Sequence, residues 1–210
     1  GHIDSIDDPV SKYVTELEGS SYGDVTGRQL LTMSSGIEWE ESASPTAELP
    51  RMFTDAYGNG EPWRDQMGGY DRAFEPGTYH RYASADTTVL SLVVQDATGQ
   101  SLSQYLETTV WQPVGMEGDA TWMIDSEGAE VGMCCFNAQL RDYTRFGLLF
   151  LNDGVHDGEQ IVPAEWVNAS TTPQPPNVWR DGEVLVRDGS ESDVLDALGE
   201  KNVIAVSPIG

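Results

Sequence analysis

The sequence predicts an α+β fold in which helices dominate and β-strands are few and short. Several segments carry apolar residues three and four positions apart, as on one face of a helix, with capping residues at their ends. The alternation typical of strands is confined to residues 119–136 and to short stretches after residue 171. Because 39% of the 210 residues are hydrophobic, the chain can bury one sizeable core.

The first predicted helices are short. Residues 8–17 begin with Asp8 as N-cap and Pro9 at the first helical position, and their apolar residues share one helical face. Residues 26–36 begin with Thr26-Gly-Arg-Gln29, the spelling of a capping box, in which the Thr and Gln side chains bind each other's backbone amides. Both segments therefore predict helices with defined starts.

A long excursion separates these helices from the next pair. Residues 40–78 are rich in Gly, Pro, Glu and Ser, and they contain one predicted helix at 47–57. An excursion of this length inside a compact domain is usually functional or forms a lobe of its own. Residues 84–97 then show helical spacing and end at a glycine, and Ser101 begins a further helix as its N-cap.

The second half predicts a hairpin and two more helices. Residues 119–136 alternate weakly around a turn at 125–128, which indicates a short hairpin. Asn137 is placed to cap an amphipathic helix that runs to Asn152, and Pro163 is placed to begin a last short helix.

Acidity is the extreme feature of the composition. The chain has 35 acidic and 11 basic residues, which gives a net charge of −24. Such a surface repels phosphate backbones and anionic lipid headgroups, which argues against nucleic-acid and membrane partners. Lysine occurs only at positions 12 and 201. High acidity with scarce lysine predicts a halophilic source, and solubility is the simpler alternative.

The sequence predicts no metal site and no disulfide. Cys134 and Cys135 are adjacent, and neighbouring cysteines rarely form a sound disulfide, so we expect a buried, reduced pair. A reduced pair slightly favours the cytoplasm. The three histidines lie far apart in the sequence and form no metal-binding pair.

Four motifs carry the chemical signal. They are Leu-Leu-Thr-Met-Ser-Ser-Gly at 30–36, a Pro-Gly turn followed by Tyr82-Ala-Ser84, Pro-Val-Gly-Met at 113–116, and Leu-Arg-Asp-Tyr-Thr-Arg-Phe-Gly at 140–147. Together they resemble the serine hydrolases of the penicillin-binding protein and class C β-lactamase family, nearest the 6-aminohexanoate-oligomer hydrolase and esterase branch. The resemblance extends from residue 1 to about residue 170.

The resemblance implies the mostly helical lobe of the serine β-lactamase-like fold, with remnants of an antiparallel sheet. We therefore expect a partial β-lactamase-like domain over residues 1–171. Residues 172–210 do not resemble the closing strands of the family and stay unassigned, with short strands predicted at 184–186 and 203–206.

The resemblance also implies hydrolysis of amide or ester bonds through an acyl-enzyme. Tyr82 matches the tyrosine that relays protons, and Ser84 matches the polar third position, where helix capping is an equal alternative. Asn137 and Trp39 are candidate substrate contacts, with capping and core packing as their alternatives. No serine in the 210 residues is followed three positions later by lysine, so the acylating Ser-x-x-Lys is absent from this sequence.

Two main hypotheses follow. In the first, the chain is part of a serine hydrolase for a small-molecule amide or ester, needs no metal or organic cofactor, and is inactive without its nucleophile segment. In the second, it is a degenerate, non-catalytic module used for binding or assembly. An unrelated acidic binding protein is a weaker third. Because missing central strands would expose apolar surface, we expect marginal stability or a homo-oligomer.

Overall fold

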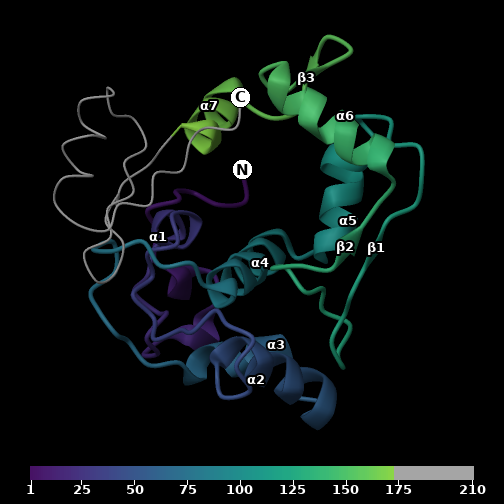
Figure 1. Cartoon of the computed structure of the whole chain (residues 1–210). Helices are drawn as coiled ribbons and strands as arrows, with labels where there is room; N and C mark the ends of the chain where they lie inside the picture. Colours follow the sequence, from purple (N-terminus) through teal and green to yellow (C-terminus); the bar gives the residue numbers. More distant parts are fainter. Residues whose placement is uncertain (173–210) are drawn as a thin grey trace, which may run out of the picture.

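The structure is a computed structural model that describes residues 1–172. This part of the chain has seven short to medium α-helices, six of them arranged around the central α4 (Figure 1). They are α1 (Gly27–Leu31), α2 (Glu48–Thr54), α3 (Trp63–Gln66), α4 (Ser84–Thr98), α5 (Leu102–Leu106), α6 (Leu140–Leu151) and α7 (Ala164–Thr171).

Two small antiparallel ladders complete the described architecture. Strand β1 (Thr121–Trp122) pairs with β2 (Phe136–Asn137), so that Thr121 lies opposite Asn137. Strand β3 (Val155–His156) pairs with β4 (Glu159–Gln160) just after α6. The predicted α+β class is therefore confirmed, with helices dominant and the sheets reduced to two-stranded pieces.

The first predicted helix takes another form. Residues 8–17 fold into two 3₁₀ turns, η1 (Val10–Lys12) and η2 (Thr15–Leu17), instead of one α-helix. The backbone of Val14, at φ −102° and ψ 82°, interrupts the helical path between them. The N–H of Val10 donates to the carbonyl oxygen of Val25, which ties this segment to the chain that precedes α1. Its apolar face is nevertheless buried, as the spacing predicted.

Two of the other predicted starts are confirmed by their caps. Thr26 and Gln29 form the capping box of α1, and Ser101 and Gln104 form that of α5. The helix predicted at 47–57 is α2, continued by a π-helical turn, η3 (Asp55–Asn59). A second π-helical turn, η5 (Glu107–Trp111), continues α5, and a 3₁₀ turn, η4 (Met67–Gly69), continues α3.

The predicted hairpin is present, with its turn where the sequence placed it. An isolated bridge joins Ile124 to Glu130 beyond the β1–β2 ladder, and the carboxylate of Asp125 accepts the N–H groups of Glu127 and Ala129 inside the turn. Only two residue pairs form the regular ladder, in agreement with the weak alternation in the sequence.

The hydrophobic core lies between the N-terminal turns, α1, the excursion and α4. One face of α4 is buried against α1, and two buried tryptophans complete the core: Trp63 from the excursion and Trp39 from just before it. The largest fully buried side chains include Trp39, Trp63, Tyr22, Leu17 and Leu30. Among the described helices, none is both long and apolar enough to cross a membrane.

Candidate active site

Tyr82 lies at the entrance to α4, two residues before the helix begins. Its side chain is half-exposed, at 49% of its full accessible area. The next residue, Ala83, is the N-cap of α4 and has extended backbone angles, so the chain turns into the helix just after the tyrosine. The structure therefore presents a half-exposed phenol at the surface where the longest described helix starts.

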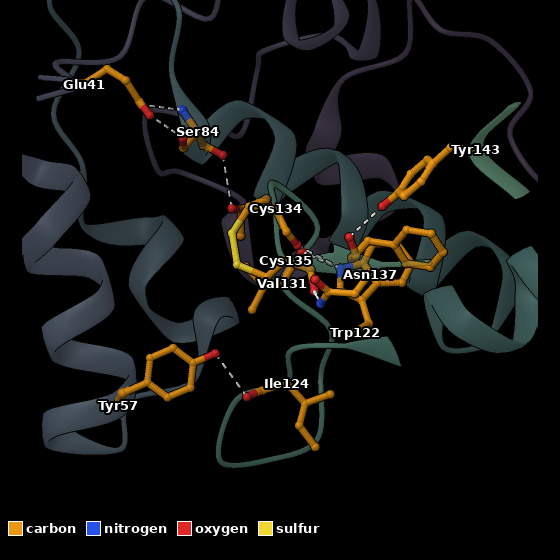
Figure 2. Close-up of a disulfide and its surroundings, with 12 residues drawn as sticks. Glu41, Tyr57, Ser84, Trp122, Ile124, Val131, Cys134, Cys135, Asn137 and Tyr143 are labelled. Atoms are coloured by element: carbon orange, nitrogen blue, oxygen red, sulfur yellow. Dashed lines mark hydrogen bonds between the residues drawn. A yellow bond between two sulfur atoms is a disulfide. The ribbon is translucent and has the colours of Figure 1, made fainter. Parts of the chain in front are cut away.

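Ser84 is buried and fully engaged with a carboxylate. Its Oγ–H donates to Glu41 Oε1 at 2.6 Å, and its backbone N–H donates to Glu41 Oε2 at 3.0 Å (Figure 2). Ser84 is the first residue of α4 and does not cap its own helix. Glu41 is thus the cap of α4, because it satisfies an unpaired N–H at the helix start and places negative charge at the positive end of the helix dipole.

Trp39 lies in the core. Only 1% of it is exposed, and its ring packs edge-to-face against Tyr70 with 5.3 Å between ring centroids. Its indole N–H donates to the carboxylate of Glu41, the same group that holds Ser84. The structure therefore favours core packing, the alternative to substrate contact, for Trp39. The ring is buried, and its indole N–H holds Glu41 in place.

Glu41 is the functional candidate that sequence reasoning missed. It lies in the excursion (residues 40–78), 43 positions before Ser84, so no local motif links the two. The available signal was indirect. Ala83, at the N-cap position of α4, has no side chain that can accept a hydrogen bond, so the helix start needed an acceptor from elsewhere.

Asn137 does not cap α6, contrary to the capping alternative. It belongs to β2, where pairing with Thr121 keeps its backbone extended, and the N-cap of α6 is Gln139. Its Nδ2 donates to the carbonyl oxygen of Cys135 at 3.1 Å. The side chain is exposed, so Asn137 stays a candidate for substrate contact.

Cys134 and Cys135 form a disulfide, so the expectation of a reduced pair is wrong. The backbone of Cys135 is in the left-handed region, at φ 67°, within a tight loop that lets neighbouring side chains meet. In Figure 2 the disulfide lies between two pairs of residues: Ser84 and Glu41 are on one side of it, and Trp122 and Asn137 are on the other. Trp122 Nε1 fixes the loop by donating to the carbonyl oxygen of Cys134 at 3.0 Å.

The loop that carries the disulfide is packed directly on α4. A Cβ at Gly132 would lie 2.3 Å from the Cβ of Ser91, which is closer than carbon atoms approach. Glycine is therefore required where the loop crosses the helix. This close packing places the disulfide beside the first turns of α4 (Figure 2).

Asp86, in the first turn of α4, carries a buried carboxyl group. It has no exposed area, and Tyr22 donates a hydrogen bond to its Oδ1 at 2.8 Å. Burial raises the pKa of Asp86 to about 7, since the charged form loses its hydration. Within residues 1–172, no three His, Cys, Asp or Glu side chains come together as a metal site would require.

The fold and the motifs define the class of protein. The chain belongs to the beta-lactamase family, whose model matches residues 2–185. It is 31% identical over 183 residues to the 6-aminohexanoate-dimer hydrolase of Paenarthrobacter ureafaciens, a match that covers 80% of this chain and 44% of that protein. The predicted family is therefore confirmed.

Solved structures show the same relationship. A putative 6-aminohexanoate-dimer hydrolase from Bacillus anthracis superposes with a TM-score of 0.70 at 26% identity, covering 80% of this chain and 46% of that one. The hydrolase EstCE1 superposes with a TM-score of 0.60 at 15% identity, which shows a shared fold alone. The chain spans less than half the length of the 6-aminohexanoate-dimer hydrolases that it matches.

Proposed function

We propose that this chain supplies part of the active site of a serine hydrolase that cleaves amide or ester bonds in small molecules. The half-exposed phenol of Tyr82 at the start of α4 is the observation that carries the proposal. Names among the relatives, 6-aminohexanoate-dimer hydrolase and D-aminopeptidase, favour short linear amides as the substrate class.

The proposed reaction uses Tyr82 as the proton carrier. A serine hydroxyl from a segment outside this sequence gives its proton to the Tyr82 phenolate, and its oxygen attacks the substrate carbonyl carbon. Tyr82 then protonates the departing amine or alcohol, and water releases the acyl group from the serine. A phenol ordinarily has a pKa near 10, so this role needs a neighbouring cation, which the lysine of Ser-x-x-Lys provides in the family.

Ser84 has a positioning role in this proposal. Its hydroxyl proton and its backbone N–H are both donated to Glu41, so neither can be donated to a substrate at the same time. Glu41 and Ser84 together hold the first turn of α4, and thereby the residues that lead into it, including Tyr82. Asn137, exposed on the other side of the disulfide, is the proposed substrate contact.

The alternative is a non-catalytic module for binding or assembly. The 210 residues contain no Ser-x-x-Lys, so the sequence is compatible with either proposal. The coding sequence before Gly1 separates the two proposals. A Ser-x-x-Lys within about 10–20 codons supports the hydrolase. A start codon with no such motif supports the module.

Tyr82→Phe tests the catalytic assignment. In a protein that carries the Ser-x-x-Lys segment, the substitution should lower kcat for p-nitrophenyl acetate by at least about 100-fold, the usual contribution of a general base. Tyr57→Phe is the matched control, because Tyr57 is 48% exposed and lies in η3. The present chain alone should not turn over p-nitrophenyl acetate or nitrocefin. If this chain alone does turn over either substrate, and Tyr82→Phe abolishes that activity, the nucleophile cannot lie in another segment and the assignment is contradicted.

A further inference from the structure

The Cys134–Cys135 disulfide lies at the junction between a loop fixed to α4 and the β1–β2 ladder. Residues 131–134 form the loop, and its Gly132 is packed so closely on α4 that a Cβ there would lie 2.3 Å from the Cβ of Ser91. Such close packing leaves the loop no room to move against the helix. The position of the loop is therefore the position of α4, the helix that begins just after the proposed catalytic tyrosine.

The ladder on the other side of the junction is held by aromatic packing. Phe136, the first residue of β2, packs edge-to-face against Trp111, Trp122 and Tyr143, with centroid distances of 5.7, 4.9 and 6.2 Å. Asn137 follows Phe136 in β2, so the ladder carries the proposed substrate contact. The two sides of the junction therefore carry different parts of the proposed site.

The backbone of Cys135 is the hinge of this junction. Its φ is 67°, in the left-handed region that residues with a Cβ rarely adopt, because the Cβ crowds the carbonyl oxygen that follows. The disulfide ties its side chain to that of Cys134, so rotation about the N–Cα bond of Cys135 is restricted while the two sulfurs are joined. Once the sulfurs are separated, rotation toward the extended backbone of β2 relieves the crowding.

Hydrogen bonds across the hinge report its state. The indole N–H of Trp122, in the ladder, donates to the carbonyl oxygens of Cys134 at 3.0 Å and Val131 at 2.8 Å, both in the loop (Figure 2). Rotation at Cys135 turns the Cys134 carbonyl relative to the ladder, so its bond to Trp122 is lost. Asn137 belongs to the ladder and therefore shifts relative to α4.

The disulfide adds little to the stability of the whole chain. It joins neighbouring residues and thus closes the shortest possible loop. A disulfide stabilises a protein mainly by restricting the unfolded chain, and this effect grows with the length of the closed loop. Both cysteines are partly exposed in the described structure, so a small reductant reaches them. Reduction should therefore leave the fold intact and act on the hinge.

We infer that the Cys134–Cys135 disulfide sets the position of Asn137 relative to Tyr82, and that reduction by a dithiol releases it, so that substrate binding depends on redox conditions. A thiolate of the dithiol attacks one cysteine sulfur and forms a mixed disulfide, and the second thiol of the reductant then displaces the other sulfur from it. Two electrons and two protons pass to the cysteines, and the reductant leaves as a cyclic disulfide. The effect on substrate rests on the proposed hydrolase function, whereas the movement of the hinge does not.

Nuclear magnetic resonance tests the hinge on the chain itself. Dithiothreitol should raise the mass by about 2 Da, for two added hydrogens, and should shift the indole N–H signal of Trp122 and speed its exchange with water. Trp111 is the internal control, because its indole N–H donates to a carbonyl oxygen outside the loop at 3.0 Å and should not respond. A variant with Cys134→Ser and Cys135→Ser should show the reduced signals from the start and should ignore dithiothreitol.

Kinetics test the effect on substrate, in a protein that carries the Ser-x-x-Lys segment. Reduction should raise KM for a short linear amide, the p-nitroanilide of 6-aminohexanoate, by about 3- to 10-fold, the contribution of one hydrogen bond. It should change kcat little, because a lost contact that binds substrate and transition state equally appears in KM alone. Asn137→Ala should raise KM in the oxidised protein, and reduction should then raise it no further.

Three results would overturn the inference. The first is a chain whose cysteines stay reduced after treatment with the thiol oxidant diamide. The second is a Trp122 signal that is the same before and after reduction. The third is a rise in KM on reduction that is as large in Asn137→Ala as in the wild type. A protein that carries the segment but hydrolyses no amide or ester would contradict the proposed function, while a shifted Trp122 signal would still support the redox response of the hinge.

Discussion

At the scale of single residues, Asp86 and Tyr22 form a buried pair whose charge state depends on pH. Burial raises the pKa of Asp86 to about 7, and it also raises the pKa of Tyr22, which therefore stays protonated as the donor. An unfolded aspartate has a pKa near 3.9. Between these two values the folded chain holds a proton that the unfolded chain has released.

The sign of the pH dependence follows from this difference. Stability from Asp86 is fully present below the unfolded pKa and is lost as the pH rises toward 7. Asp86→Asn keeps the shape and removes the charge, so it should abolish most of this loss between pH 5 and pH 8. The free energy of unfolding in urea at both pH values measures the effect.

The control for this measurement is Asp119→Asn, at an exposed position. That variant should keep the pH dependence of the wild type. The assignment fails if the Asp86→Asn chain loses as much stability between pH 5 and pH 8 as the wild type does, because another group would then be titrating.

Local motifs point to two of the candidate residues, and contacts between residues distant in sequence reveal the groups around them. Tyr82 and Ser84 could be predicted because they stand together in one short motif. The partners of Ser84 and Asp86 could not be, since Glu41 and Tyr22 lie 43 and 64 positions away. The disulfide was missed for another reason: it depends on the left-handed backbone of Cys135, which no residue type at that position signals.

At the scale of elements, carboxylates that accept hydrogen bonds from backbone N–H groups hold the helix starts and turns of this acidic chain. Glu41 accepts the first N–H of α4, and Glu130 accepts the N–H groups of Leu102 and Ser103 at the start of α5. Asp142 accepts the N–H groups of Glu117 and Gly118 in the turn before β1. These acids act on the backbone, so their replacement should affect the elements that they cap.

A double-mutant cycle on Glu41 and Ser84 tests this role. Glu41→Ala should lower the free energy of unfolding by about 1–3 kcal/mol, because it leaves a buried hydroxyl and a helix N–H without an acceptor. Ser84→Ala removes one of the two bonds and should cost less. Since the two residues share a bond, their effects should not add, with a coupling above about 0.5 kcal/mol.

Glu40→Ala is the control for this cycle. Glu40 is exposed, and its carboxylate accepts a hydrogen bond from the neighbouring Ser42, so its loss should change stability by less than about 0.5 kcal/mol. Strict additivity of Glu41→Ala and Ser84→Ala in urea unfolding would mean that the carboxylate does not act through Ser84.

The elements themselves could be predicted wherever the residues that fix their ends lie close together in the sequence. Thr26 with Gln29 and Ser101 with Gln104 fixed two helix starts, because a capping box is complete within four residues. The helix expected at 8–17 failed, since its apolar spacing fits two 3₁₀ turns as well as one α-helix, and tertiary contact with Val25 decides between them. The cap of α6 failed because β-pairing of Asn137 took precedence over its capping preference.

At the scale of the whole molecule, the acidic surface sets the response to salt. Six described basic residues, including Lys12, Arg64 and Arg145, are each paired with at least one carboxylate. With 35 acidic residues against 11 basic ones, most carboxylates have no basic partner and repel one another. Salt weakens both the ion pairs and the repulsion between carboxylates. Because the repulsion involves far more charges, its loss outweighs the loss of the ion pairs.

The melting temperature should therefore rise with potassium chloride. The Debye length falls from about 10 Å at 0.1 M to about 3 Å at 1 M, so repulsion between exposed carboxylates largely disappears over this range. We expect the chain to melt several degrees higher at 2 M than at 0.1 M, as measured by circular dichroism at low micromolar concentration, where association does not contribute. A variant with Glu18, Asp119 and Glu127 changed to their amides should gain less from salt, because these exposed acids add to the repulsion. Equal melting temperatures at low and molar salt would reject the halophilic interpretation and leave solubility as the role of the acidity.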